Sequence, residues 1–154
     1  MKKALIIFPI AGFLLVALAV AQMQYITVTA DVQPYYSVVF SYNTVNFGSV
    51  YPGTEIPAPG NAQGEYYASV ETAMELQVTV GRTAWSPSDV LTLKFASALN
   101  EIPTVPEYEI GTTFIIVDSI APGSHTHYHA YWLYVPPEAS PGTYSTTVTI
   151  TYTP

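Results

Sequence analysis

The apolar side chains of this sequence recur at every second position, a spacing that suits β-strands and not helices. In the closing segment, residues 144–153, one face would carry only Ser and Thr, and the other Thr146 and the bulkier Tyr144, Val148, Ile150 and Tyr152. Because successive strand residues point to opposite faces of a sheet, this pattern predicts a half-buried strand. After residue 21 no stretch shows helical periodicity, and 13 prolines among 154 residues would interrupt long helices.

Segments with this alternation, or rich in β-branched and aromatic residues, follow one another at short intervals between Pro and Gly turns. The predicted strands are 24–32, 35–42, 47–53, 65–70, 74–80, 90–96, 112–118, 126–135 and 144–153. The Pro- and Gly-rich segments 54–64 and 101–111 are predicted loops, and the apolar run 112–118 is predicted to be a central strand. Eight or nine short strands with frequent turns predict an all-β fold, a β-sandwich of Ig-like or jelly-roll type.

The first 21 residues have the features of a secretory leader. Lys2 and Lys3 give a positive start, the run 4–20 is apolar and uncharged, and residues 19–21 form a small-x-small tripeptide. We therefore expect cleavage between Ala21 and Gln22 and secretion of the mature chain. The predicted organisation is a signal peptide at 1–21, an N-terminal strand at 22–32 and a sandwich domain at 33–154.

Two other interpretations of the leader stay open. The run 4–20 lies at the short end of the range for a membrane span, so it could remain as an anchor. The start Lys2-Lys3-Ala4-Leu5 also resembles the cleavage site of archaeal type IV pilins, which retain the apolar helix as the filament core. Against that interpretation, Pro9 would interrupt the helix.

The composition excludes several classes of function. The chain has no cysteine, which removes disulfides, thiolate metal sites and cysteine nucleophiles. Only four Lys and Arg, with a net charge of −7, argue against nucleic-acid binding, which needs clustered cations. Nucleophile-elbow and phosphate-loop motifs are absent, and the acidic pairs Glu71/Glu75 and Glu107/Glu109 match no catalytic motif. We therefore predict that the protein is not an enzyme and needs no cofactor.

The sequence has one pattern that resembles a set of metal ligands, three histidines at alternate positions: His125, His127 and His129. On a strand they share one face, and a His-x-His pair can bring two imidazoles to one ion. Three such residues span about 13 Å along a straight strand, too far for all to ligate one ion. No acidic companion is evident in the sequence. The favoured interpretation is therefore an exposed strand end with solvated histidines and no metal.

The aromatic residues are more numerous than one small core needs, with 13 Tyr and two Trp. In the segment 126–135 one face carries Tyr128, Trp132 and Tyr134, while the other is also apolar or aromatic. Tyr and Trp favour interfaces because they bury a large area and keep a polar tip. We therefore expect Tyr128, Trp132 and Tyr134 to contribute to a subunit interface or, alternatively, to a surface that binds carbohydrate.

The order of features resembles that of archaeal bundling pilins and, more distantly, of TasA-type biofilm matrix fibre proteins. The resemblance covers nearly the whole mature chain and is carried by the leader, Ile26-Thr27-Val28-Thr29-Ala30, Val45-Asn46-Phe47-Gly48-Ser49-Val50-Tyr51-Pro52-Gly53, Trp132-Leu133-Tyr134-Val135-Pro136 and Pro141-Gly142-Thr143-Tyr144.

This resemblance implies an extracellular filament of identical subunits, which could also bundle, built by donor-strand complementation. In such filaments each subunit lacks one strand, and the N-terminal segment of a neighbour fills the gap. The donor residues implied here are Ile26, Val28, Ala30 and Val32. The implied function is cell–cell cohesion in a biofilm, with no nucleic acid and, once the leader is removed, no membrane as partner.

Two alternatives to this function stay open. The protein could be a monomeric secreted sandwich that binds carbohydrate or the cell-surface layer, with the segment 26–32 paired in its own domain. It could also be a type IV pilin that retains its N-terminal helix.

Overall fold

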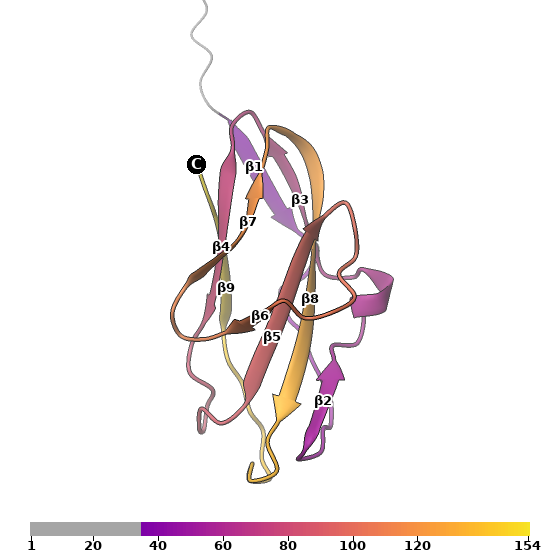
Figure 1. Ribbon diagram of the computed structural model, residues 1–154, viewed down its shortest axis with the longest axis vertical. Coiled ribbons are helices and arrows are strands. Elements are labelled where there is room, and N and C mark those ends of the chain that lie inside the picture. Colours follow the sequence, from indigo (N-terminus) through magenta and orange to yellow (C-terminus); the bar gives the residue numbers. More distant parts are fainter. Residues whose placement is uncertain (1–34) are drawn as a thin grey trace, which may run out of the picture. The chain divides into compact units, whose positions relative to one another are not determined.

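The computed structural model describes residues 35–154, which form a sandwich of two antiparallel sheets. It confirms the predicted all-β fold, with nine strands among the described residues (Figure 1). The strands are β1 (Tyr36–Phe40), β2 (Thr54–Pro57), β3 (Tyr67–Thr72), β4 (Leu76–Arg82), β5 (Thr92–Leu99), β6 (Tyr108–Ile110), β7 (Ile115–Ile120), β8 (Gly123–Val135) and β9 (Val148–Thr153). The predicted leader, the cleavage site at Ala21 and Gln22, and the predicted donor segment lie outside the described residues.

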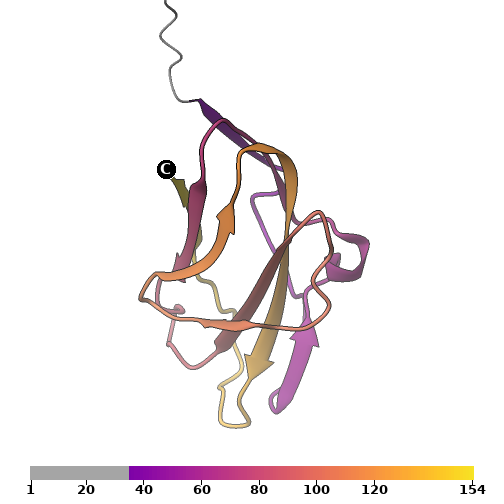
Figure 2. The ribbon, with the colours of Figure 1, turned by 45° about the horizontal axis from the view of Figure 1, so that its top comes forward.

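The larger sheet is built around β8, the longest strand. Its order is β1-β3-β8-β5-β6, and β2 pairs with the last part of β8, beyond the stretch that pairs with β3. The smaller sheet has the order β7-β4-β9. Figure 2 shows the two sheets facing each other as separate layers.

The core lies between the two sheets because the alternating apolar residues of both face inward. Leu76, Val78 and Val80 of β4 are fully buried, and so are Phe95 of β5 and Ile110 of β6. With no cysteine in the sequence, packing and hydrogen bonds hold this core together.

β8 also gives the body two distinct ends. Gly123 at its start pairs with Thr72, which pairs in turn with Tyr36 at the start of β1. Val135 at its end pairs with Thr54 at the start of β2. We call these the Tyr36 end and the Val135 end. The twelve residue steps between Gly123 and Val135 separate the two ends by about 40 Å.

The structure corrects two predictions between β1 and β3. The segment 54–64, predicted as loop, contains β2 and a short 3-10 helix, Asn61–Gln63, because its first four residues pair with β8. The segment 47–53, predicted as a strand, has no strand partner. Asn46 explains this, because its side-chain oxygen accepts a 2.8 Å hydrogen bond from the Gly48 N–H, and Gly48 has a φ of +69°, which together turn the backbone locally.

Two further predictions, farther along the chain, are also wrong. The apolar run 112–118 is not central, because β7 is an edge strand with Ile116 60% exposed and Phe114, just before it, 53% exposed. The Phe114 ring lies against Gly81, where a Cβ would come within 3.0 Å of the ring. The absence of a side chain at Gly81 therefore leaves room for the Phe114 ring. The predicted loop 101–111 contains the short strand β6.

We expect Phe95→Ala to destabilise the sandwich by about 3–5 kcal/mol, because it empties a fully buried aromatic site between the sheets. Chemical denaturation followed by tyrosine and tryptophan fluorescence measures this change. Val39→Ala in β1 is the control, since Val39 is 62% exposed and its loss should cost little. Equal losses in the two variants would contradict the assigned core.

Candidate functional site: an open groove along β9

One side of the sandwich is closed and the other is open. On the closed side the Arg82 N–H donates to the Gly111 carbonyl at 2.9 Å, and the Tyr108 hydroxyl donates to the Val117 carbonyl at 3.1 Å. On the opposite side a groove of about 1120 Å³ separates the smaller sheet from the larger one. Its two banks are the segment 139–150, which leads into β9, and the segment 42–52, which follows β1.

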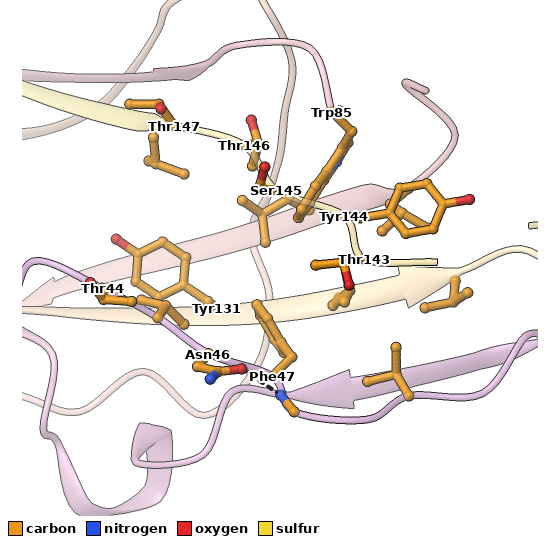
Figure 3. Close-up of a pocket in the computed structure, with 18 of the residues that line it drawn as sticks. Thr44, Asn46, Phe47, Trp85, Tyr131, Thr143, Tyr144, Ser145, Thr146 and Thr147 are labelled. Carbon is orange, nitrogen blue, oxygen red and sulfur yellow. Dashed lines mark hydrogen bonds between the residues drawn. The ribbon is translucent and has the colours of Figure 1, made fainter. Parts of the chain in front are cut away.

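Figure 3 shows the two banks facing each other, with Thr143–Thr147 and Trp85 on one side and Thr44, Asn46 and Phe47 on the other. Tyr131 of β8 lies between them. The floor is apolar, and it includes Leu91, Leu93, Leu133 and Val135, which are all at least 95% buried. A ligand in this groove would therefore contact the hydrophobic core itself.

The inward face of β9 is only partly covered. Val148 and Ile150 pack against the core but are only half-buried, whereas Tyr152, farther along the strand, is 7% exposed. On the other bank, Val45, Phe47 and Val50 are also half-buried. Apolar side chains on both banks thus turn toward the core without a strand to cover them.

The backbone of this bank is also unpaired on one side. Ser145 and Ser86 exchange two backbone hydrogen bonds, of 2.9 and 3.1 Å, and the Thr147 carbonyl accepts from the Thr83 N–H at 2.9 Å. Alternate strand residues direct their N–H and C=O groups to the same side, so the groups of Thr146, Val148 and Ile150 point away from β4. Among the described residues β9 has no second neighbouring strand. This row of donors and acceptors is the edge that an added strand would satisfy.

A buried polar network closes the groove near the end of β1. Tyr42 and Tyr131, which both line the groove, are joined through their hydroxyls at 2.6 Å, and Tyr42 also reaches Nδ1 of His129 at 2.7 Å. The Nε2 atom of His129 lies 3.2 Å from the Tyr152 hydroxyl, which lies 2.8 Å from Nδ1 of His127. The network therefore joins the larger sheet to β9.

The network ends on a carboxylate. The Nε2–H of His127 donates to Oδ2 of Asp118 at 3.1 Å. One proton assignment satisfies the whole chain, with each group donating to the next in the order Tyr131, Tyr42, His129, Tyr152, His127, Asp118. A protonated His129 would break this order, because its Nδ1–H would face a hydroxyl that already donates to it.

The electrostatics agree with this assignment. Burial lowers the pKa of His129 well below its usual 6.5, and the nearby His127 lowers it further. Burial by itself would raise the pKa of Asp118, but the hydrogen bonds from His127 and the Ser119 backbone bring it below its usual value. Burial raises the pKa of Tyr42, Tyr131 and Tyr152, so their hydroxyls stay protonated.

The histidines therefore differ from the sequence interpretation. His127 and His129 are not solvated at a strand end, because they are 0% and 1% exposed. His125 is half-buried and its Nε2 lies 3.0 Å from the Ala121 carbonyl. Sequence reasoning missed Asp118, whose pairing with His127 crosses from one sheet to the other. Within residues 35–154 no three His, Cys, Asp or Glu side chains are arranged to hold a metal ion.

The predicted aromatic interface lies on the outer face of the larger sheet. Trp132 is 8% exposed and packs with Ala96 and Ala130, so the chain itself covers most of its ring. Tyr128 and Tyr134 are half-buried, and Tyr128 lies beside Tyr67 with 6.0 Å between ring centroids. That these three residues form a subunit interface stays a prediction.

The donor residues Ile26, Val28, Ala30 and Val32 lie outside the described residues. Among the residues that the structure does describe, no helix is long and apolar enough to cross a membrane. No protein-family model matches the chain, and no curated protein matches it significantly.

We expect the folded protein to lose stability on mild acidification through His129. The unfolded chain takes up a proton near pH 6.5, whereas the folded chain does so only at lower pH. Stability is therefore complete above about pH 6.5 and is lost as the pH falls from there through the folded-state value, by up to about 1.4 kcal/mol per pH unit. Denaturation midpoints measured between about pH 7.5 and pH 5, above the range in which Asp118 titrates, report this loss.

The matched variants are His129→Gln and His125→Gln. The first should flatten the pH dependence, whatever its effect on stability at neutral pH, and the second should preserve it because His125 lies outside the network. A wild-type slope retained in His129→Gln would show that the buried imidazole is not the group responsible.

Proposed function

We propose that this protein is a secreted structural subunit of an extracellular filament that serves cell–cell cohesion. Subunits join by donor-strand complementation, in which the N-terminal segment 22–32 of one copy fills the groove along β9 of another. The observation that carries this proposal is the groove itself, because its half-covered apolar banks and the unpaired edge of β9 are complementary to one amphipathic strand.

The donor segment has the chemistry that the groove requires. Ile26, Val28, Ala30 and Val32 share one face of an extended segment, and Thr27, Thr29 and Asp31 share the other. The apolar face would cover Val148 and Ile150, while the polar face would remain toward solvent. The backbone of the same segment would pair with the edge of β9.

The lengths also agree. Phe40 at the end of β1 lies beside Tyr152, with 5.9 Å between ring centroids, so the groove starts where β1 ends. The part of the β9 bank that follows the bends at Pro141 and Gly142, from Tyr144 to Ile150, covers six residue steps, or about 20 Å along an extended chain. The segment from Ile26 to Val32 covers the same six steps.

The position of the groove favours a donor from another copy. The described chain begins at Tyr35, beside the Tyr36 end, whereas the groove extends from the end of β1 to the Val135 end. If the segment before Tyr35 turned back at Gln33 and Pro34, about four residues would be needed to pass β1. Only residues up to 28 would then reach the groove, and Ala30 and Val32 would lie outside it. A donor from a second copy can place all four residues in the groove.

We expect Val28→Asp to abolish filaments, because it places a carboxylate in the apolar groove. Burying an unpaired charge there should weaken subunit association by more than 100-fold. Thr29→Asp is the matched control, since the neighbouring side chain faces solvent and filaments should persist. On the acceptor side, Val148→Asp and Thr149→Asp form the equivalent pair. Electron microscopy and light scattering measure assembly.

A mixture of the two assembly-deficient chains tests the mechanism further. Val28→Asp retains an intact groove and Val148→Asp retains an intact donor, so the mixture should form heterodimers and stop there. Filaments at normal yield from Val28→Asp would overturn the proposal. A wild-type chain that stays monomeric at high concentration would instead favour a monomeric binding sandwich.

A further inference from the structure

We propose that the donor strand runs antiparallel to β9, in a register that pairs Ile26 with Ile150, Val28 with Val148, Ala30 with Thr146 and Val32 with Tyr144. This inference rests on the proposed function and makes it specific, since it names the contacts between two copies and the direction of the filament.

The direction follows from where the chain begins and where the groove lies. β9 runs toward the Tyr36 end. Its last residue, Thr153, pairs with Gln77 near the start of β4. The turn between β3 and β4 lies at the Tyr36 end, because the Ala73 N–H in that turn donates to the Tyr35 carbonyl at 2.9 Å. The groove is open toward the Val135 end, where Pro141 and Pro52 line it. A donor from a copy beyond the Val135 end enters the groove there, so its last residues lie at the Val135 end and its first residues lie deepest, at the closed end. The donor chain therefore runs toward the Val135 end, opposite to β9.

The two directions lead to different assemblies. With an antiparallel donor, the Tyr36 end of one copy meets the Val135 end of the next, both copies point the same way, and the contact repeats without closing. With a parallel donor, the body of the donating copy must lie beyond the Tyr36 end, so the two Tyr36 ends face each other. Each copy could then fill the groove of the other, which gives a closed, strand-swapped dimer. Only the antiparallel direction gives a filament.

The register follows from the alternation on both strands. Thr146, Val148 and Ile150 direct their backbone groups to the open edge. Donor residues directly opposite them form hydrogen-bonded pairs in an antiparallel ladder. The same pairing brings the apolar donor face onto the inward-facing side chains, and a shift by one residue would turn Thr27 and Asp31 into the groove. Placing Ile26 beside Ile150, at the closed end, puts Val32 at Tyr144, just after the bends at Pro141 and Gly142.

This direction also creates a second contact between copies. It brings the Tyr36 end of the donating copy, with Tyr35 57% and Tyr36 44% exposed, against the Val135 end of the acceptor. At that end Tyr51, beside the groove, is 76% exposed. These tyrosines are large amphipathic side chains of the kind that interfaces bury.

Engineered cysteines test the direction cleanly, because the native chain has none. The full chain carrying Val32→Cys and Tyr144→Cys should form intermolecular disulfides in the antiparallel register, and oxidised filaments should run as a ladder of oligomers on a denaturing gel. Val32→Cys with Ile150→Cys reports the parallel direction and should give no cross-link. Residues 144 and 150 lie about 20 Å apart on an extended strand, and a disulfide needs Cα atoms within about 7 Å, so the two pairs exclude each other. Both variants must first assemble normally under reducing conditions. If the 32/144 variant does not, Ile26→Cys with Ile150→Cys replaces it as the antiparallel pair. If the 32/150 variant does not, Ile26→Cys with Tyr144→Cys replaces it as the parallel pair.

Each outcome separates the inference from the proposed function. A ladder from the 32/144 pair supports both. A ladder from Val32→Cys with Thr146→Cys, without one from the 32/144 pair, supports the antiparallel direction but overturns the register. Cross-linked dimers from the 32/150 pair overturn the direction while copies still exchange strands. An intramolecular disulfide from Val28→Cys with Ile150→Cys, seen as a faster-migrating monomer, overturns the proposed function as well, because residue 28 is the one that would reach the start of the groove if the chain turned back on itself.

Discussion

The organisation of this sandwich depends on the unpaired edge of β9. A strand edge and an apolar face can each be tolerated at a protein surface, but here both occur on the same segment and face the same groove. Val148 and Ile150 point toward a core that the described residues do not close over. One amphipathic strand would pair the edge and cover these side chains in the same step. If that strand comes from a second copy, as we propose, assembly and completion of the fold are a single event.

The closed end of the groove has a different chemistry from the rest. Tyr42, His129 and Tyr152 join the two sheets through hydrogen bonds at the point where β1 ends. A buried network in which every member has a partner fixes the relative position of the elements it joins, because each group left without a partner would cost about 1–3 kcal/mol. We therefore regard the network as the fixed end against which a donor strand would stop.

The sequence predicted the local features of this fold and missed the long-range ones. Alternation from Tyr144 to Tyr152 predicted which face of the last strand turns inward, because that pattern depends only on neighbouring residues. It did not reveal that this face is half covered, since coverage depends on which segment lies across the groove. The pairing of His127 with Asp118 was missed for the same reason, as the two residues come from different sheets. β2 was hidden by the prolines and glycines around it, and the turn at Gly48 was hidden in a run that reads as a strand.

The most direct test of the central claim is amide hydrogen exchange along β9 of the full chain, measured over a range of protein concentrations. The amide groups of Val148 and Ile150 face the open edge, whereas those of Thr149 and Thr151 face β4. If a second copy completes the sheet, Val148 and Ile150 will be protected at high concentration and will lose protection on dilution, while Thr149 and Thr151 stay protected throughout. Protection of Val148 and Ile150 that does not change with dilution would contradict this account, because the chain would then be covering its own edge.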